Sequence, residues 1–186
     1  MRHSMKTIRT FFTFILIIFS STIIASIFGI INNQISYTIS NEFFEYYLFG
    51  NFGTNNLNIS NKRIEASIVG IIGTYWVGLI IGFIYAIIFL FLKHSKKLEN
   101  IYLTILINIA FAILGSLIGF LIANFLIGWE NSGVFIDFGI QHPQNYVNAA
   151  YMNSGSYYGG FIGLIFGIIY LLKKDGIKIL TRKNAA

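Results

Sequence analysis

The sequence predicts an all-α protein: a polytopic membrane protein whose four-transmembrane-helix bundle carries a small extracytoplasmic helical head. Two features of the chain support this fold class: four long apolar stretches separated by polar segments, and basic residues concentrated on one side of the implied layout. Hydrophobic residues make up 55% of the 186 residues and charged residues only 11%, whereas charged residues form about a quarter of a soluble domain. A soluble domain of this size cannot hide so much apolar surface. We therefore expect a single membrane domain over residues 1–186.

The apolar stretches have the length of membrane-crossing helices, which need about 20 apolar residues. None of them contains Asp, Glu, Lys, Arg or His, and they cover residues 10–31, 66–92, 101–127 and 157–172. The first follows basic residues, as a signal peptide does. Its apolar region exceeds the roughly 7–15 residues of a signal peptide and no clean cleavage site follows, so we interpret it as a span.

The distribution of cations predicts the orientation. Of the 13 Lys and Arg residues, all but Lys62 and Arg63 lie in the two tails or in the short connection between the second and third spans. The positive-inside rule then places both termini in the cytoplasm and the loops 32–65 and 128–156 outside. We expect a multi-pass protein of a bacterial inner (plasma) membrane. The net charge of +6 fits contact with anionic lipid headgroups, and no nucleic-acid partner is expected.

The second and fourth spans are predicted to belong to longer helices that project outward. Asn61 suits the cap of a helix running to Lys93, and Pro143 suits the first turn of one running to Lys173. At 1.5 Å per residue each helix is about 45–50 Å long, more than the hydrocarbon core. With residues 42–49, an aromatic segment that predicts an interfacial helix, these extensions form the expected head.

Small residues recur at helical spacing in three spans. The second span has them at four-residue intervals, as Gly70, Thr74, Gly78, Gly82 and Ala86. In lipid, helices associate through close backbone approach rather than the hydrophobic effect. Such faces either hold a monomeric bundle together, or they serve a homo-oligomer, a protein partner or a solute path. The first span has fewer small residues, so we expect it to be peripheral.

Few residues suggest chemistry. The chain has no cysteine, which excludes disulfides and thiolate sites, and its spans lack the embedded charge that a proton-coupled transporter needs. Asn108, the most deeply placed amide, predicts an interhelical hydrogen bond or, alternatively, a channel constriction. His142 stands alone on the outer side and is interpreted as a surface residue. We expect no catalytic residues, no metal site and no cofactor.

Two motifs carry a resemblance. The first is Thr74-Tyr75-Trp76-Val77-Gly78-Leu79, and the second runs from Ala150 to Gly160. Together they resemble a group of uncharacterised bacterial four-span integral membrane proteins, in which the first motif has a second aromatic at the place of Tyr75. The second motif of that group has a histidine near the place of Asn153, which here cannot act as a base. The resemblance implies a class of protein and no activity.

Both motifs lie where the second and fourth spans leave the membrane on the predicted outer side. An aromatic belt with interhelical hydrogen bonds explains these residues without a ligand, and we favour this interpretation. The candidate ligand or partner residues, together with the deep amide, are Thr74, Tyr75, Trp76, Tyr151, Asn153, Ser156 and Asn108.

The sequence thus predicts an integral membrane protein without a catalytic site, acting as an accessory, assembly or lipid-interacting component. Its expected partners are membrane lipids, with a second copy or another protein as candidates for the small-residue faces. The alternative is an oligomeric transporter or channel for a neutral or weakly polar solute. A third interpretation is an enzyme acting on lipid headgroups through Glu65, His142 or Glu130.

Overall fold

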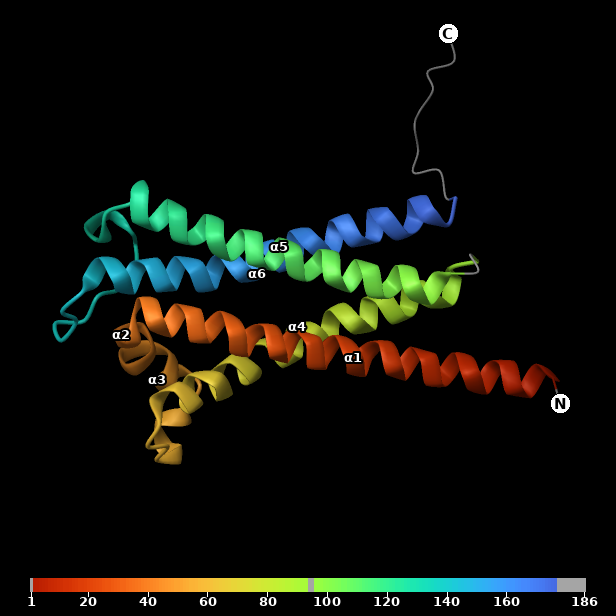
Figure 1. The fold of residues 1–186 in the computed structure, drawn as a ribbon, viewed down its shortest axis with the longest axis horizontal. Helices are drawn as coiled ribbons and strands as arrows, with labels where there is room; N and C mark the ends of the chain where they lie inside the picture. The colour runs from red at the N-terminus through yellow and green to blue at the C-terminus, as the bar shows by residue number, and fades with distance from the viewer. Residues whose placement is uncertain (1, 94–95, 177–186) are drawn as a thin grey trace, which may run out of the picture.

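Four long helices run side by side along the molecule and confirm the predicted fold class. The computed structural model describes residues 2–93 and 96–176, and within these ranges every regular element is helical. Each of the four long helices is long and apolar enough to cross a membrane. The start of the first and the end of the last lie at the same end of the bundle (Figure 1). The helices are α1 (Arg2–Ile39), α4 (Lys62–Phe91), α5 (Lys97–Phe125) and α6 (Pro143–Lys174).

The bundle consists of two antiparallel pairs, α1 with α4 and α5 with α6, and the helices of each pair cross (Figure 1). Glycines allow the backbones to meet at both crossings. A Cβ atom added to Gly78 of α4 would lie 2.6 Å from Cβ of Ala25 in α1. One added to Gly163 of α6 would lie 2.8 Å from Cα of Asn108 in α5. Contacts between the two pairs are much sparser than those within them.

α1 is the least buried of the four long helices, as expected of a more peripheral span, but it is paired as closely with α4 as α5 is with α6. The small-residue face of α4 packs on α1 along most of its length, with Gly70 against Gly29 and Gly82 against Ser21. On α1, Ser21 occupies a contact position that glycine often takes at a helix crossing. The face of α1 that carries small side chains is therefore longer than its glycines and alanines alone indicate. The small-residue faces are therefore used, at least in part, for packing inside the chain.

The head lies at the end opposite the termini. Short helical turns follow α1 there: α2 (Asn41–Phe43), the π-helical turn η1 (Phe44–Leu48), α3 (Phe49–Asn51) and the 3-10 turn η2 (Thr54–Leu57). Their large side chains pack against the head ends of α4 and α6, forming a cluster of Phe43, Phe44, Leu48, Phe49, Ala66, Val69, Tyr146 and Ala149. The aromatic segment is thus helical, as predicted, but much of its apolar surface faces the core of the head.

The predicted starts of two helices are confirmed. Asn61 caps α4 by accepting a hydrogen bond on Oδ1 from the Arg63 amide at 3.0 Å, and Pro143 occupies the first turn of α6. In contrast, α1 continues to Ile39, well past the predicted span boundary at residue 31. Asn33 Nδ2 donates to the Ala66 carbonyl of α4 at 3.1 Å. Bonds of this kind hold the extra turns on the partner helix, and they shorten the loop expected over residues 32–65.

Candidate functional site

The first motif lies on α4 and only part of it faces the interior. Thr74 is at the crossing with α1, where Oγ1 lies 2.9 Å from the Ala25 carbonyl and 2.7 Å from the Gly70 carbonyl. Tyr75 and Trp76 are both exposed on the side of the bundle, at 45% and 42%. The threonine therefore helps to join two helices, whereas the two aromatic side chains face the surroundings.

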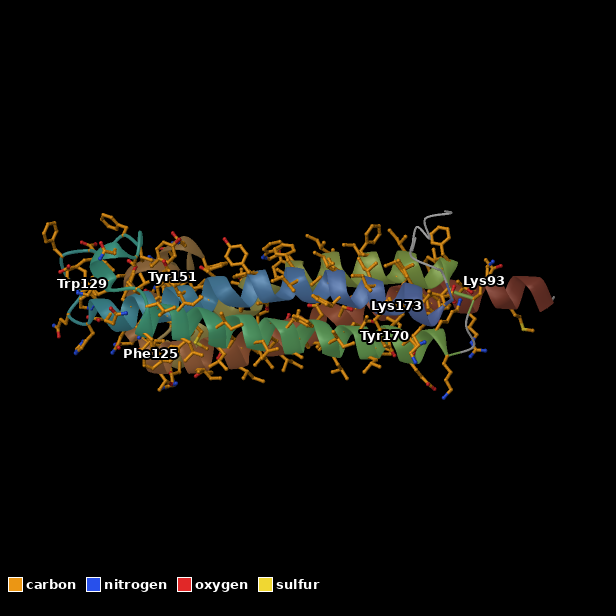
Figure 2. The ribbon with its side chains drawn as sticks, turned by 90° about the horizontal axis from the view of Figure 1, so that it is seen from above. Lys93, Phe125, Trp129, Tyr151, Tyr170 and Lys173 are labelled. Atoms are coloured by element: carbon orange, nitrogen blue, oxygen red, sulfur yellow. The ribbon has the colours of Figure 1, made fainter. Side chains whose placement is uncertain are left out.

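The second motif lies on α6 and divides in the same way. Ser156 Oγ donates to the Asn153 carbonyl at 2.7 Å within the helix, and Tyr157 Oη donates to the Gly73 carbonyl of α4 at 2.9 Å. Tyr151 points to the loop before α6, where its hydroxyl donates to the Ser132 carbonyl at 2.9 Å. Figure 2 shows Tyr151 near the head end of the bundle, the end that also carries Trp129.

A small polar cavity brings together three of the predicted candidates: Thr74, Asn153 and Ser156. Its volume is about 10 Å³, room for about one water molecule. It lies where α1, α4, α6 and the head meet. The other candidates are elsewhere: Tyr75, Trp76 and Tyr151 do not line the cavity. Asn108 is buried in the α5–α6 pair, where Nδ2 donates to the Gly160 carbonyl at 3.1 Å.

A much larger cleft separates α1 from α5. Its volume is about 710 Å³, within the range of about 300–1,000 Å³ typical of ligand pockets. Among the described residues, Asn32 and Ser116 are the only polar ones that line it, and none of those that line it is ionisable. The apolar residues that complete the lining are Ile24, Ile27, Phe28, Ile31, Ile35, Ile39, Ile109, Ile113, Leu117, Phe120 and Met152.

The two polar residues of the cleft bond to each other across the two helix pairs. Ser116 Oγ of α5 donates to Asn32 Oδ1 of α1 at 2.9 Å. Both side chains are deeply buried, with exposures of 3% for Ser116 and 6% for Asn32. Asn32 also lines the small polar cavity, so its side chain lies between that cavity and the cleft. This pair is the polar centre of the candidate site.

Sequence reasoning missed Asn32 because the predicted first span ended one residue before it. A usable signal was present in the sequence. Ala25, Gly29, Asn32 and Ser36 follow one another at spacings of four, three and four residues, the pattern of one helix face. Extending the helix along that face would have brought Asn32 into the bundle.

Two carboxylates of the head, those of Glu42 and Glu65, have structural partners. The carboxylate of Glu42 accepts hydrogen bonds from the backbone amides of Gln141 at 2.7 Å and His142 at 3.0 Å. His142 Nδ1 lies 3.7 Å from the same carboxylate. Glu65 is fully buried and is held by Lys62 Nζ at 2.7 Å and Thr54 Oγ1 at 3.1 Å. Within residues 2–93 and 96–176, no three His, Asp or Glu side chains converge as a metal site would require.

The fold and the cleft define a membrane protein with a bundle of four apolar helices and a compact head at one end. Comparison of the chain with protein families, curated proteins and solved structures finds no match.

Proposed function

We propose that this protein is a lipid-binding component of its membrane, with no catalytic role, and that an acyl chain occupies the cleft between α1 and α5. The observation that carries the proposal is the chemistry of the cleft: about 710 Å³ lined by apolar side chains and two neutral polar ones. Such a lining favours a hydrocarbon chain and disfavours any charged solute, because a charge buried without a partner is strongly destabilised.

The cleft is accessible from the side of the bundle. Ile31 and Ile35 of α1 are 56% and 51% exposed, and Ile113 and Leu117 of α5 are 54% and 51% exposed. In a bilayer these side chains meet lipid rather than water. An acyl chain can therefore enter laterally between the helices without crossing a polar barrier.

The cleft is longer than the hydrocarbon of one lipid leaflet, so it also reaches the headgroup level. Its lining residues on α1 run from Ile24 to Ile39, which is about 22 Å at the rise of an α-helix. One leaflet contributes about 15 Å of hydrocarbon. The cleft is thus long enough for a single extended chain, and it lies in the half of α1 nearest the head.

The orientation of the bundle determines which of the two leaflets the cleft faces. We infer that both termini are cytoplasmic and that the head faces outward from a bacterial inner membrane. Lys93 and Lys173 support this orientation, because they lie at the end of the bundle opposite Trp129 and Phe125 (Figure 2). The proposed lipid then comes from the outer leaflet.

The transporter alternative has less support. Asn108, the residue proposed for a constriction, donates its amide hydrogen to the Gly160 carbonyl inside a helix pair. The small-residue faces of α4 and α6 meet the backbones of their partner helices. These contacts account for both features through packing alone.

Native mass spectrometry of the mildly extracted protein tests the proposal. The wild-type protein is expected to retain a lipid of definite mass. Ile113→Trp, which fills the cleft, is expected to lose most of it. The matched control is Leu106→Trp on the same helix, because Leu106 is 59% exposed and does not line the cleft. Absence of bound lipid in the wild type, or equal retention by the two variants, contradicts the proposal.

A further inference from the structure

The side chain of Asn32 is buried, and its amide group makes one of the four hydrogen bonds that a primary amide can make. Its Oδ1 accepts from Ser116 Oγ at 2.9 Å, whereas Nδ2 donates to no group in the described part of the chain. A primary amide has two N–H donors. The Asn32 side chain is only 6% exposed, but Nδ2 is not among the fully buried atoms without a partner. Nδ2 therefore keeps a small open surface, from which a water or a ligand can accept a hydrogen bond.

The surroundings of Asn32 restrict what can accept from it. No described residue that lines the cleft carries a positive charge to pair with a phosphate. The matching group is therefore a neutral acceptor oxygen attached to an apolar body. The small cavity on the other side of Asn32 has a volume of about 10 Å³. Because it accommodates about one water, it can satisfy one N–H and leave the other for a ligand in the cleft.

The depth of Asn32 identifies that ligand group. Asn32 directly follows residues 10–31, the apolar run that is long enough to cross the hydrocarbon core. It therefore lies near the boundary between hydrocarbon and headgroups. The ester linkages of a glycerolipid lie at this boundary, and their carbonyl oxygens are neutral acceptors.

We infer that Asn32 recognises an ester carbonyl oxygen of the glycerolipid whose acyl chain occupies the cleft. The inference rests on the proposed function and adds the chemical class of the ligand. The amide of Asn32 donates to the carbonyl, while the chain packs against apolar residues such as Ile31 and Ile113. No bond is made or broken, so the site selects a lipid and does not transform it.

The test is a competition between two lipids that differ only in their linkage. The purified protein is incubated with equal amounts of diacyl phosphatidylglycerol and its dialkyl ether analogue of the same chain length, and the bound masses are compared. The ether lacks the carbonyl acceptor. One neutral hydrogen bond corresponds to a preference of about threefold to tenfold for the ester.

Two variants separate the hydrogen bond from the packing. Asn32→Leu keeps an apolar cleft of similar size and is expected to bind both lipids equally. Ser116→Ala removes the bond to Oδ1 but leaves the Nδ2 donor, so it is expected to keep the ester preference. Retention of the preference by Asn32→Leu overturns the inference.

The wild-type result distinguishes failure of the Asn32 contact from failure of lipid binding in the cleft. Retained lipid without an ester preference overturns the role of Asn32 and leaves lipid binding in the cleft intact. No retained lipid of either kind overturns the proposed function, and the inference falls with it. If Asn32→Leu does not fold, the absence of an ester preference in the wild type still overturns the inference.

Discussion

Ser116 Oγ lies 2.9 Å from Asn32 Oδ1 and joins two helix pairs that otherwise share few polar contacts. Its counterpart toward the other end of the bundle is the contact of Ser20 Oγ with Tyr102 Oη at 3.2 Å, also between α1 and α5. Packing within each pair is close because glycine faces meet there. The interface between the pairs, where the cleft lies, has far fewer contacts than either pair has within itself.

Loss of this bond is expected to destabilise the protein moderately. Ser116→Ala leaves Asn32 Oδ1 without its donor, and we expect the free energy of unfolding to fall by about 0.5–1.5 kcal/mol. Unfolding in detergent micelles, followed by tryptophan fluorescence, measures the change. Ser154→Ala is the matched control, because Ser154 is exposed. An equal effect of both substitutions contradicts a specific role for the bond.

The helix crossing in the second pair is predicted to be intolerant of a single methyl group. A Cβ atom on Gly115 of α5 would collide with the Gly155 carbonyl of α6. We therefore expect Gly115→Ala to destabilise the protein by about 1–3 kcal/mol through overpacking. Gly128→Ala serves as the control, since nothing lies within 4 Å of a Cβ atom there. Thermal unfolding of the two variants in the same detergent makes the comparison.

The buried carboxylate of Glu65 makes its cation important for stability. Lys62→Met leaves this fully buried group without the ammonium that lies 2.7 Å away. We expect a loss of about 1–3 kcal/mol, less than the roughly 3–5 kcal/mol of a fully buried pair, because Lys62 is itself 46% exposed. In the exposed pair of Lys96 with Glu99, Lys96→Met should change stability by less than about 1 kcal/mol. Equal melting shifts for the two variants would argue against this account.

Glu42 is expected to fix the start of α6. Its carboxylate accepts from the amides of Gln141 and His142, directly before the first helical turn. Glu42→Ala removes both bonds, and the loss of such a cap costs about 1 kcal/mol. Hydrogen exchange should accelerate at these two amides. Glu130→Ala, at an exposed position in η3 (Trp129–Asn131), should leave their exchange unchanged.

The sequence predicted the elements of the fold better than their pairing. Apolar runs define spans locally, and Asn61 and Pro143 mark helix starts through chemistry that acts within one turn. The pairing of α1 with α4 depends on which faces meet. Ser21 on α1 takes a glycine-like position at that crossing, and a rule based on glycine and alanine does not detect it.

The candidate site was harder to predict than the fold for a related reason. Thr74, Asn153 and Ser156 line a common cavity, which their similar predicted depth in the membrane suggested. The cleft itself is the space left between α1 and α5, so it depends on the separation of two helix pairs. No local pattern encodes that separation. Asn32 becomes a candidate only when both helices are in place.

The orientation of the bundle can be tested directly, because the chain contains no cysteine. Phe138 is a fully exposed loop residue between α5 and α6, and Lys93 is exposed just after α4. If the head faces outward, a membrane-impermeant thiol reagent should label the Phe138→Cys variant in intact cells. It should reach the Lys93→Cys variant only after the membrane is opened. The reverse pattern would invert the topology and assign the cleft to the cytoplasmic leaflet, so this experiment also determines which lipids the cleft can meet.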